Sequence, residues 1–190
     1  MKDKLILMMG VSGSGKTTLL TELLQTHSQL ILVPSYTTRP MRKNEKNGRK
    51  YWHISPEEFQ KFIDNGEFLE YALVHQKYYY GTKISEIQKA FGKGLTPITE
   101  LDMHGLEKIK KDNKGIDYVS IFLDLSDDVM LDRIKMRGGI DQEEIDRRLA
   151  SAQHERKLAK NYCDYVLDTD NTLLQNIQNI NKLVKKILDE

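Results

Sequence analysis

The sequence predicts an α/β fold in which helices flank a parallel sheet, and two observations support this prediction. First, a short glycine-rich segment separates an apolar run from a helical pattern, in the order strand, loop, helix. Second, strand signals recur with helical patterns between most of them, and such alternation is typical of parallel sheets. The signals lie at 5–9, 30–34, 68–74, 95–101, 117–125 and 164–167.

The glycine-rich segment reads GVSGSGKTT and fits the phosphate-loop (P-loop) pattern G-x-x-x-x-G-K-[ST]. In this pattern glycines let backbone N–H groups turn toward phosphate oxygens, Lys16 reaches the β- and γ-phosphates, and the Thr17 hydroxyl ligates Mg²⁺. An ordinary Gly/Ser turn is the alternative, but the lysine, the threonine and both flanks favour a nucleoside triphosphate. The residues that we predict to bind it are Gly10, Val11, Ser12, Gly13, Ser14, Gly15, Lys16, Thr17 and Thr18.

The composition indicates one domain with small inserts. A chain of 190 residues is long enough for a single core, and no linker rich in Pro, Gly or Ser divides it. Because 29 Lys and Arg residues balance 28 Asp and Glu residues, we expect neither a nucleic-acid nor a membrane partner. Cys163 is the only cysteine, which favours a reducing compartment, and the first apolar run is too short for a signal peptide. We therefore expect a cytoplasmic protein, either a monomer or a homodimer.

Three helices between or after the strands are marked by local signals. The first, at 56–65, begins with Ser55 as N-cap and Glu58 as its capping-box partner. A second, at 142–160, places apolar residues on one face, and the Gly138–Gly139 pair before it is suited to a hinge. These apolar residues are Ile145, Leu149, Ala152 and Leu158. The third helix closes the chain, where apolar residues recur with helical spacing.

Residues 35–54 break the alternation and look like part of an inserted antiparallel unit. The segment SYTTRPMRKNEKNGRKY is polar and basic. Ser35, Arg39, Arg42 and Tyr51 offer two guanidinium forks and two hydroxyls, a set suited to one phosphate group. Taken singly, Arg42 fits ordinary surface charge and Tyr51 fits a half-buried strand position. Together with the phosphate loop, they predict a second substrate that carries a phosphate.

With the phosphate loop, this segment resembles the guanylate kinase family, and the resemblance covers nearly the whole chain. In that family a loop of the form S-x-T-T-R-x-x-R, followed by an acidic residue, a glycine and a tyrosine, holds the phosphate of GMP. The chain supplies Ser35, Thr37, Thr38, Arg39, Arg42, Glu45, Gly48 and Tyr51 in that order. The resemblance implies a P-loop NTPase-type sheet with an inserted mixed α/β GMP-binding unit and a helical lid. It divides the chain into a core at 1–34, 83–130 and 160–190, the insert at 35–82 and the lid at about 131–159.

The resemblance also implies how guanine is recognised. Glu70, in FLEYALV, stands at the family's guanine-reading carboxylate, and in YYYGT Tyr80 matches a phosphate-contacting tyrosine and Thr82 a base-contacting hydroxyl. A carboxylate suits guanine, whose N1–H and N2–H₂ donors lie side by side, whereas adenine presents an acceptor at N1. An unmatched buried polar site costs about 1–3 kcal/mol, which is enough for roughly tenfold discrimination.

The segment TELDMHG resembles the family's D-x-D-x-Q-G, with Glu100 in place of the first aspartate and His104 in place of the glutamine. On a strand of period two, Glu100 and Asp102 face the same side. The resemblance implies that Asp102 contacts GMP and that Glu100, with Thr17, holds Mg²⁺. Pro97 conflicts with a central strand, so we expect a bulge or a late strand start there.

The lid of the family carries arginines, and Arg133, Arg137 and Arg148 occupy the matching positions here. Without the resemblance, each fits a helix-surface charge paired with a nearby acid equally well. Near the end the chain reads DTDN, with Thr169 where the family has an asparagine. The five histidines lack metal-ligand spacing, and we expect them mainly at the surface or at its boundary.

The predicted reaction is Mg²⁺-dependent transfer of the γ-phosphoryl group of ATP to GMP, giving ADP and GDP. The nucleophile is a phosphate oxygen that is already anionic near neutral pH, so no general base is required. We predict that Lys16, Arg133, Arg137 and Arg148 are catalytic because they neutralise charge on the transferring group. Two alternatives remain open: a related phosphate-loop kinase with another phosphorylated acceptor, and a non-catalytic guanylate-kinase-like binding module.

Overall fold

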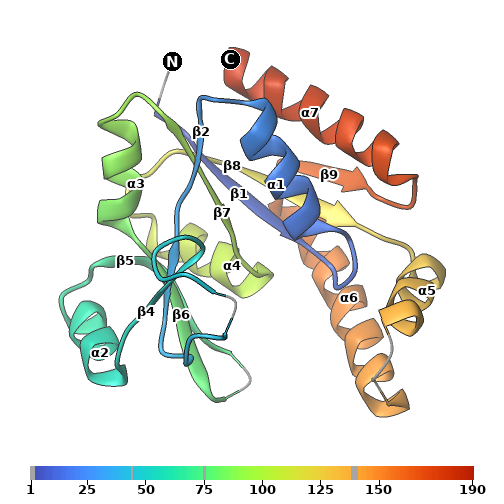
Figure 1. Cartoon of the computed structure of the whole chain (residues 1–190), viewed down its shortest axis with the longest axis horizontal. Helices are drawn as coiled ribbons and strands as arrows, with labels where there is room; N and C mark the ends of the chain where they lie inside the picture. Colours follow the sequence, from blue (N-terminus) through green and yellow to red (C-terminus); the bar gives the residue numbers. More distant parts are fainter. Residues whose placement is uncertain (1–2, 44, 75, 138–140) are drawn as a thin grey trace.

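The computed structural model describes residues 3–43, 45–74, 76–137 and 141–190, and its main layer is a five-stranded sheet in which every pair is parallel. Figure 1 shows helices on both sides of this sheet. In spatial order the strands are β2 (Leu30–Leu32), β7 (Thr96–Glu100), β1 (Leu5–Gly10), β8 (Tyr118–Asp124) and β9 (Tyr165–Asp168). The predicted parallel sheet with flanking helices is confirmed.

The central strand β1 is buried because its alternating residues pack against helices on opposite faces of the sheet. Ile6 and Met8 pack on one side with α1 (Lys16–Thr26) and α7 (Leu173–Asp189). Leu5, Leu7 and Met9 pack on the other side. The helices there are α3 (Ile84–Phe91), α4 (Met103–Asp112), α5 (Asp127–Arg137) and α6 (Gln142–Tyr162). Burial on both faces explains why this strand reads as an unbroken apolar run.

All six predicted strands are found within two residues of the expected bounds. At Pro97 the expected late start applies to the ladder with β1 and not to the strand, which includes Pro97. β7 begins at Thr96, and its pairing with β1 begins only at Ile98, whereas Pro97 itself lies opposite Ile31 of β2. The proline therefore precedes the ladder to β1 and does not interrupt it.

A smaller, four-stranded sheet packs beside the main one and carries the helix α2 (Pro56–Asp64). In spatial order its strands are β4 (Tyr51–His53), β3 (Ser35–Thr37), β6 (Tyr78–Lys83) and β5 (Phe68–Val74). The expectation that 35–54 belongs to an antiparallel unit is wrong for β4, which runs parallel to β3 with Tyr51 opposite Ser35. The reason is that the intervening segment returns the chain to the end where β3 begins. The other pairs are antiparallel, so the sheet is mixed in strand direction.

Aromatic rings fill the space between α2 and the small sheet. Phe59 of α2 is fully buried and stacks on Phe68 and Tyr79, with ring centroids 4.5 Å and 5.3 Å apart. Phe62 and Tyr36 meet edge to face at 5.7 Å. Stacked and edge-to-face pairs are the favoured geometries of aromatic contacts, and they give this small sheet a core of its own.

The predicted N-cap of α2 is confirmed, because the Ser55 hydroxyl accepts a hydrogen bond from the Glu58 N–H at 3.1 Å. This is one half of the predicted capping box. A complete capping box begins α7, where the Thr172 hydroxyl and the Gln175 side chain each accept from the other residue's backbone N–H.

The helix predicted at 142–160 corresponds to α6, and its apolar face is directed toward the core. Ile145 and Ala152 are buried, and Leu149 and Leu158 pack against the same cluster. The hinge expected at Gly138–Gly139 lies outside the described residues. Among the helices that the structure describes, none is long and apolar enough to cross a membrane.

Candidate functional site

The glycine-rich loop connects the end of β1 to the start of α1, as predicted. A Cβ atom at Gly10 would lie 2.5 Å from the backbone oxygen of Leu123, so only glycine fits between β1 and β8. Gly15 is the N-cap of α1 and has a left-handed backbone with φ of 87°. No side chain in the described part of the chain caps this helix. Its first N–H groups are therefore available to an anion.

Lys16 folds back over this loop. Its Nζ donates to the carbonyl of Gly10 and, at 3.1 Å, to that of Val11. Burial lowers the pKa of Lys16, while the nearby acids Glu155 and Glu100 act in the opposite direction. A bound polyanion can replace these carbonyls as the partner of the Lys16 ammonium group, because hydrogen bonds to a charged acceptor are stronger than those to a neutral carbonyl.

The other residues of the loop differ in what they offer a ligand. Val11 is fully buried in the core, so only its backbone remains for a phosphate. Ser14 is also buried, and within the described residues its hydroxyl has no hydrogen-bond partner. Thr17 and Thr18 are exposed at the start of α1.

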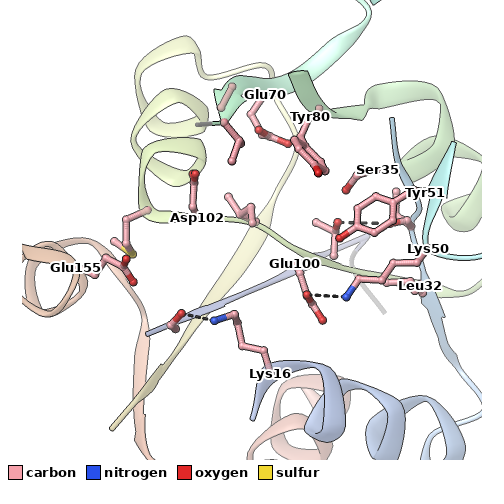
Figure 2. Close-up of a pocket in the computed structure, with 18 of the residues that line it drawn as sticks. Lys16, Leu32, Ser35, Lys50, Tyr51, Glu70, Tyr80, Glu100, Asp102 and Glu155 are labelled. Carbon is pink, nitrogen blue, oxygen red and sulfur yellow. Dashed lines mark hydrogen bonds and ion pairs between the residues drawn. The ribbon is translucent and has the colours of Figure 1, made fainter. Parts of the chain in front are cut away.

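A cavity of about 440 Å³ lies between the main sheet and the small sheet, and Figure 2 shows the side chains that line it. The phosphate loop forms one wall, and strands of the small sheet form another. The predicted site residues that line the cavity are Gly10, Ser12, Lys16, Ser35, Tyr51, Glu70, Tyr80, Glu100 and Asp102. The fold thus brings the predicted donor and acceptor residues to one space.

Glu70 lies in β5 opposite Thr82 of β6, and only 7% of the residue is exposed. Burial raises the pKa of Glu70 to about 7. The negative charge of Asp102 adds to this rise, whereas Thr82 and Lys108 oppose it. The carboxyl group of Glu70 therefore changes its protonation near neutral pH.

Arg39 is held by a polar network in the small sheet. Its Nε donates to the Tyr80 hydroxyl at 3.1 Å, and its Nη2 pairs with Glu45 at 2.7 Å. Glu45 also accepts from the Arg42 N–H at 2.9 Å, and the Arg39 and Arg42 hydrogen bonds lower the pKa of Glu45 to about 2. His53 completes the network, with Nδ1 2.7 Å from the Arg39 carbonyl oxygen and Nε2 3.4 Å from Glu45.

His53 lies at the boundary between core and surface, within the range expected for the histidines. Only 11% of its side chain is exposed, because β4 runs alongside β3 and brings His53 to the Arg39 backbone. His104 does lie at the surface, with 74% of its side chain exposed, and His154 is exposed as well. His27 is half-buried, and His75 is outside the described residues.

Three of the predicted acceptor residues do not line the cavity themselves. Arg39 lies behind it, with its guanidinium carbon 5.5 Å from the centre of the Tyr51 ring. Thr82 is buried in β6, and Arg42 is exposed. The lining tyrosine in β6 is Tyr80, since the ring of its neighbour Tyr79 stacks on Phe59.

Glu100 and Asp102 both line the cavity, but the predicted reason is wrong. Glu100 is the last residue of β7, whereas Asp102 lies beyond the strand as the N-cap of α4, where its carboxylate accepts from the Gly105 N–H at 2.8 Å. The strand period does not relate the two residues, because the chain has already turned toward the helix. One oxygen of Glu100 pairs with Lys50 at 3.1 Å. The other is buried and has no hydrogen-bond partner among the described residues.

The first predicted lid arginine contacts the phosphate loop directly. Arg133, on α5, donates from Nη1 to the Gly13 carbonyl at 3.0 Å and from Nη2 to the Thr169 carbonyl at 2.8 Å. Thr169 is itself buried, and its hydroxyl donates to the Asp124 carbonyl at 2.6 Å. The guanidinium of Arg133 thus bridges the loop and the end of β9.

The second lid arginine approaches the loop from α6. Arg148 donates from Nη1 to the Ser12 hydroxyl at 3.3 Å and from Nε to Glu144 at 2.7 Å. It therefore pairs with an acid on its own helix and also reaches the loop. Arg137 is the last residue of α5, and its side chain lies outside the described part of the structure.

Comparison with known proteins identifies the family. The family model described as guanylate kinase matches residues 2–188. The chain belongs to the guanylate kinase family. The resemblance inferred from the phosphate loop and the 35–51 segment is confirmed at this level.

Individual relatives agree with this membership. The guanylate kinase of Neisseria gonorrhoeae is 40% identical over 155 residues, which is 81% of this chain and 74% of the relative. The guanylate kinase of Prochlorococcus marinus is 37% identical over 183 residues, with 96% and 97% covered. A crystal structure of guanylate kinase from Anaplasma phagocytophilum superposes with a TM-score of 0.71, covering 98% of this chain and 85% of that chain, at 24% identity. This last likeness supports the fold.

Two charged residues that line the cavity were not predicted from the sequence. Glu155, on α6, lines the cavity near Lys16, and burial raises its pKa. It follows Arg148 by seven residues, or two helical turns, so helix periodicity would have placed both on one face. Lys50 also lines the cavity and pairs with Glu100. No signal in the sequence marks this second contact, which depends on how the two sheets meet.

Proposed function

We propose that this chain catalyses Mg²⁺-dependent transfer of the γ-phosphoryl group of ATP to the phosphate of GMP, giving ADP and GDP. One observation carries the proposal: a single cavity has the phosphate loop on one wall and, on the other, the buried Glu70 carboxyl group with the hydroxyls of Ser35, Tyr51 and Tyr80. Membership of the guanylate kinase family supports the same reaction. A donor and an acceptor bound in this space would meet end to end, as in-line transfer requires.

The guanine base of GMP is recognised by Glu70. Its ionised carboxylate accepts the N1–H and N2–H₂ donors as a pair, and Asp102 lies on the same side of the cavity. Adenine offers an acceptor where guanine offers N1–H, so it would leave a buried carboxylate without its partner. This mismatch supports a preference for GMP over AMP.

The phosphate of GMP is bound by the hydroxyls of Ser35, Tyr51 and Tyr80 together with Arg39. The network with Glu45 and Tyr80 orients the Arg39 guanidinium before the substrate arrives. Such preorganisation lowers the entropy lost on binding. Arg42 and Thr82 complete the acceptor site when the small sheet closes on GMP.

The donor phosphates are bound by the loop between β1 and α1. Lys16 exchanges the Gly10 and Val11 carbonyls for the β- and γ-phosphates, and Thr17 and Thr18 lie at the start of the same helix. Arg133 and Arg148, with Arg137, supply further positive charge to the transferring phosphoryl group. The contacts of Arg133 and Arg148 with Gly13 and Ser12 support this role.

The oxygen ligands of the site fit Mg²⁺. The buried Glu100 oxygen that lacks a hydrogen-bond partner among the described residues, and the exposed Thr17 hydroxyl, are hard donors of the kind that Mg²⁺ prefers. These two residues would hold the ion together with the donor phosphates. When bound, the ion neutralises charge on the β- and γ-phosphates.

For this reaction the protein needs only to position the two nucleotides and to neutralise their negative charge. An oxygen of the GMP phosphate attacks the γ-phosphorus, a new P–O bond forms, and the bond to the β,γ-bridging oxygen breaks as ADP leaves. Both reactants are anions, so their repulsion is the obstacle. Lys16 and the lid arginines reduce it, while closure of the small sheet and the lid excludes water and suppresses hydrolysis of ATP.

A coupled assay of ADP formation tests the proposal. The purified protein is mixed with ATP, Mg²⁺ and one acceptor at a time: GMP, dGMP, AMP, UMP or ribose bisphosphate. We expect ADP formation with GMP well above the rate without acceptor. Activity with another acceptor instead of GMP would indicate a related kinase, and no activity with any of them would favour a binding module. The cytoplasmic location and the monomeric or dimeric state stay predictions of the sequence.

A further inference from the structure

Lys50 lines the cavity and links the two sheets. It lies in the small sheet immediately before β4, where its carbonyl accepts from the Ser35 N–H at 3.1 Å. Its side chain crosses to the main sheet and pairs with Glu100 at the end of β7. Figure 2 shows its ammonium group on one side of Glu100 and that of Lys16 on the other.

The position of Lys50 is the junction between the predicted donor and acceptor sites. On the acceptor side, its Nζ lies 5.8 Å from the centre of the Tyr51 ring. On the donor side, Glu100 is in register with Met8 of β1, two residues before the loop begins. Burial is the main cause of the lowered pKa of Lys16, and the charge of Lys50 adds to it, as expected for two ammonium groups on either side of Glu100.

An ordinary ion pair that ties the two sheets together is the simpler interpretation. Two features speak against it. The Lys50 side chain is 35% exposed, and pairs with that much solvent contact contribute little to stability. The second Glu100 oxygen is buried with no hydrogen-bond partner in the described chain, so the carboxylate is not satisfied by Lys50 alone. The carboxylate of Glu100 can therefore accept a further positively charged partner in addition to Lys50, which a purely structural ion pair would not require.

We propose that Lys50 is a further catalytic residue, whose ammonium group leaves Glu100 to contact the phosphoryl group in transfer between the two nucleotides. The inference rests on the proposed function. A lysine suits this task because its compact charge sits on a flexible stem, which can follow the moving group. Glu100 holds the ammonium group at the junction until the phosphates, with their greater negative charge, compete for it.

The test compares Lys50→Met with a matched control, Lys61→Met, which removes a charge from the exposed face of α2 in the same sheet. Two quantities are measured: kcat with saturating ATP, Mg²⁺ and GMP, and the Kd of GMP alone by calorimetry without metal. We expect Lys50→Met to lower kcat by about 10²-fold, the lower end of the usual loss when one transition-state donor is removed. The Kd of GMP should change less than about threefold, because Arg39 and its network hold the acceptor phosphate. Lys50→Arg should recover part of the kcat.

Two results would overturn the inference. One is a kcat for Lys50→Met within twofold of that of Lys61→Met. The other is a loss that appears entirely in the Kd of GMP, which would make Lys50 only a binding residue. If Lys50→Met does not fold, as judged by circular dichroism, Lys50→Gln takes its place. Failure of the proposed function is distinguishable, since the wild-type protein itself would then form no ADP with GMP.

Discussion

The main sheet and the small sheet are built differently, and the difference shows what fixes each half of the cavity. The phosphate loop follows directly from β1, whose residues are buried by apolar contacts on both faces. The acceptor side depends instead on polar contacts, above all those that join Arg39 to Glu45 and Tyr80. A close-packed apolar core therefore fixes the positions of the donor residues, whereas hydrogen bonds and ion pairs among the acceptor residues fix theirs.

This contrast predicts how substitutions on the two sides behave. On the donor side, a change in a ligand-facing loop side chain such as Lys16 should alter the chemistry and leave the fold intact, because that side chain is not part of the apolar core. On the acceptor side, a change should alter affinity for GMP and its dependence on conditions, because the charges there are coupled.

The largest effect is expected on the donor side, from Lys16→Met. Loss of its charge should lower kcat by about 10²- to 10³-fold, the usual cost of removing one donor from a transition state. The melting temperature should be unchanged or higher, because burial already disfavours the charged form of Lys16 and methionine removes that cost. Steady-state kinetics and a thermal melt measure the two quantities. A large fall in melting temperature would show that the loop side chains do support the core.

The same contrast explains what the sequence could predict. The strands of the main sheet and the phosphate loop were located because an apolar run buried on both faces and a fixed spacing of glycines are local signals. The GMP-binding residues could be named only through the resemblance to a family. Their contacts were not predicted, since Arg39, Glu45 and Tyr80 meet through the pairing of β3 with β6.

Two errors have one physical cause, because tertiary contacts decide what local sequence patterns leave open. The parallel pairing of β4 depends on the path of the chain after β3, and no spacing in the sequence encodes it. Asp102 was assigned to a strand that ends at Glu100, because the cap of α4 takes over there.

A second prediction concerns Glu70 and pH. Below neutral pH the carboxyl group, with a pKa of about 7, binds a proton and no longer accepts both guanine donors. The KM for GMP should therefore rise by about tenfold between pH 8 and pH 6, since one pKa unit corresponds to a tenfold change in protonation. Glu70→Gln should raise the KM for GMP at pH 8 by about 10- to 100-fold and should remove most of this pH dependence. The phosphate of GMP also titrates in this range, and the variant controls for it.

The same substitution also tests the direction of the pKa shift in the absence of substrate. The folded protein holds the Glu70 proton up to about pH 7, whereas an unfolded chain releases it near pH 4.5. Glu70 therefore destabilises the fold increasingly as pH rises through this interval. Urea unfolding should show Glu70→Gln to be more stable than the wild-type protein at pH 8 and equally stable at pH 4. The reverse order would mean that Glu70 is ionised at low pH in the folded chain.

The smallest effect is expected from the helix caps, and it tests whether the two sheets unfold separately. Ser55→Ala and Thr172→Ala each remove a capping hydroxyl, which costs about 1 kcal/mol. Because α2 packs on the aromatic core of the small sheet, Ser55→Ala should speed hydrogen exchange there and leave the global unfolding free energy nearly unchanged. Thr172→Ala should lower the global value, because α7 packs on the main sheet. Equal losses in global stability for both variants would show that the two sheets form one cooperative unit, and the contrast between them would then be one of composition alone.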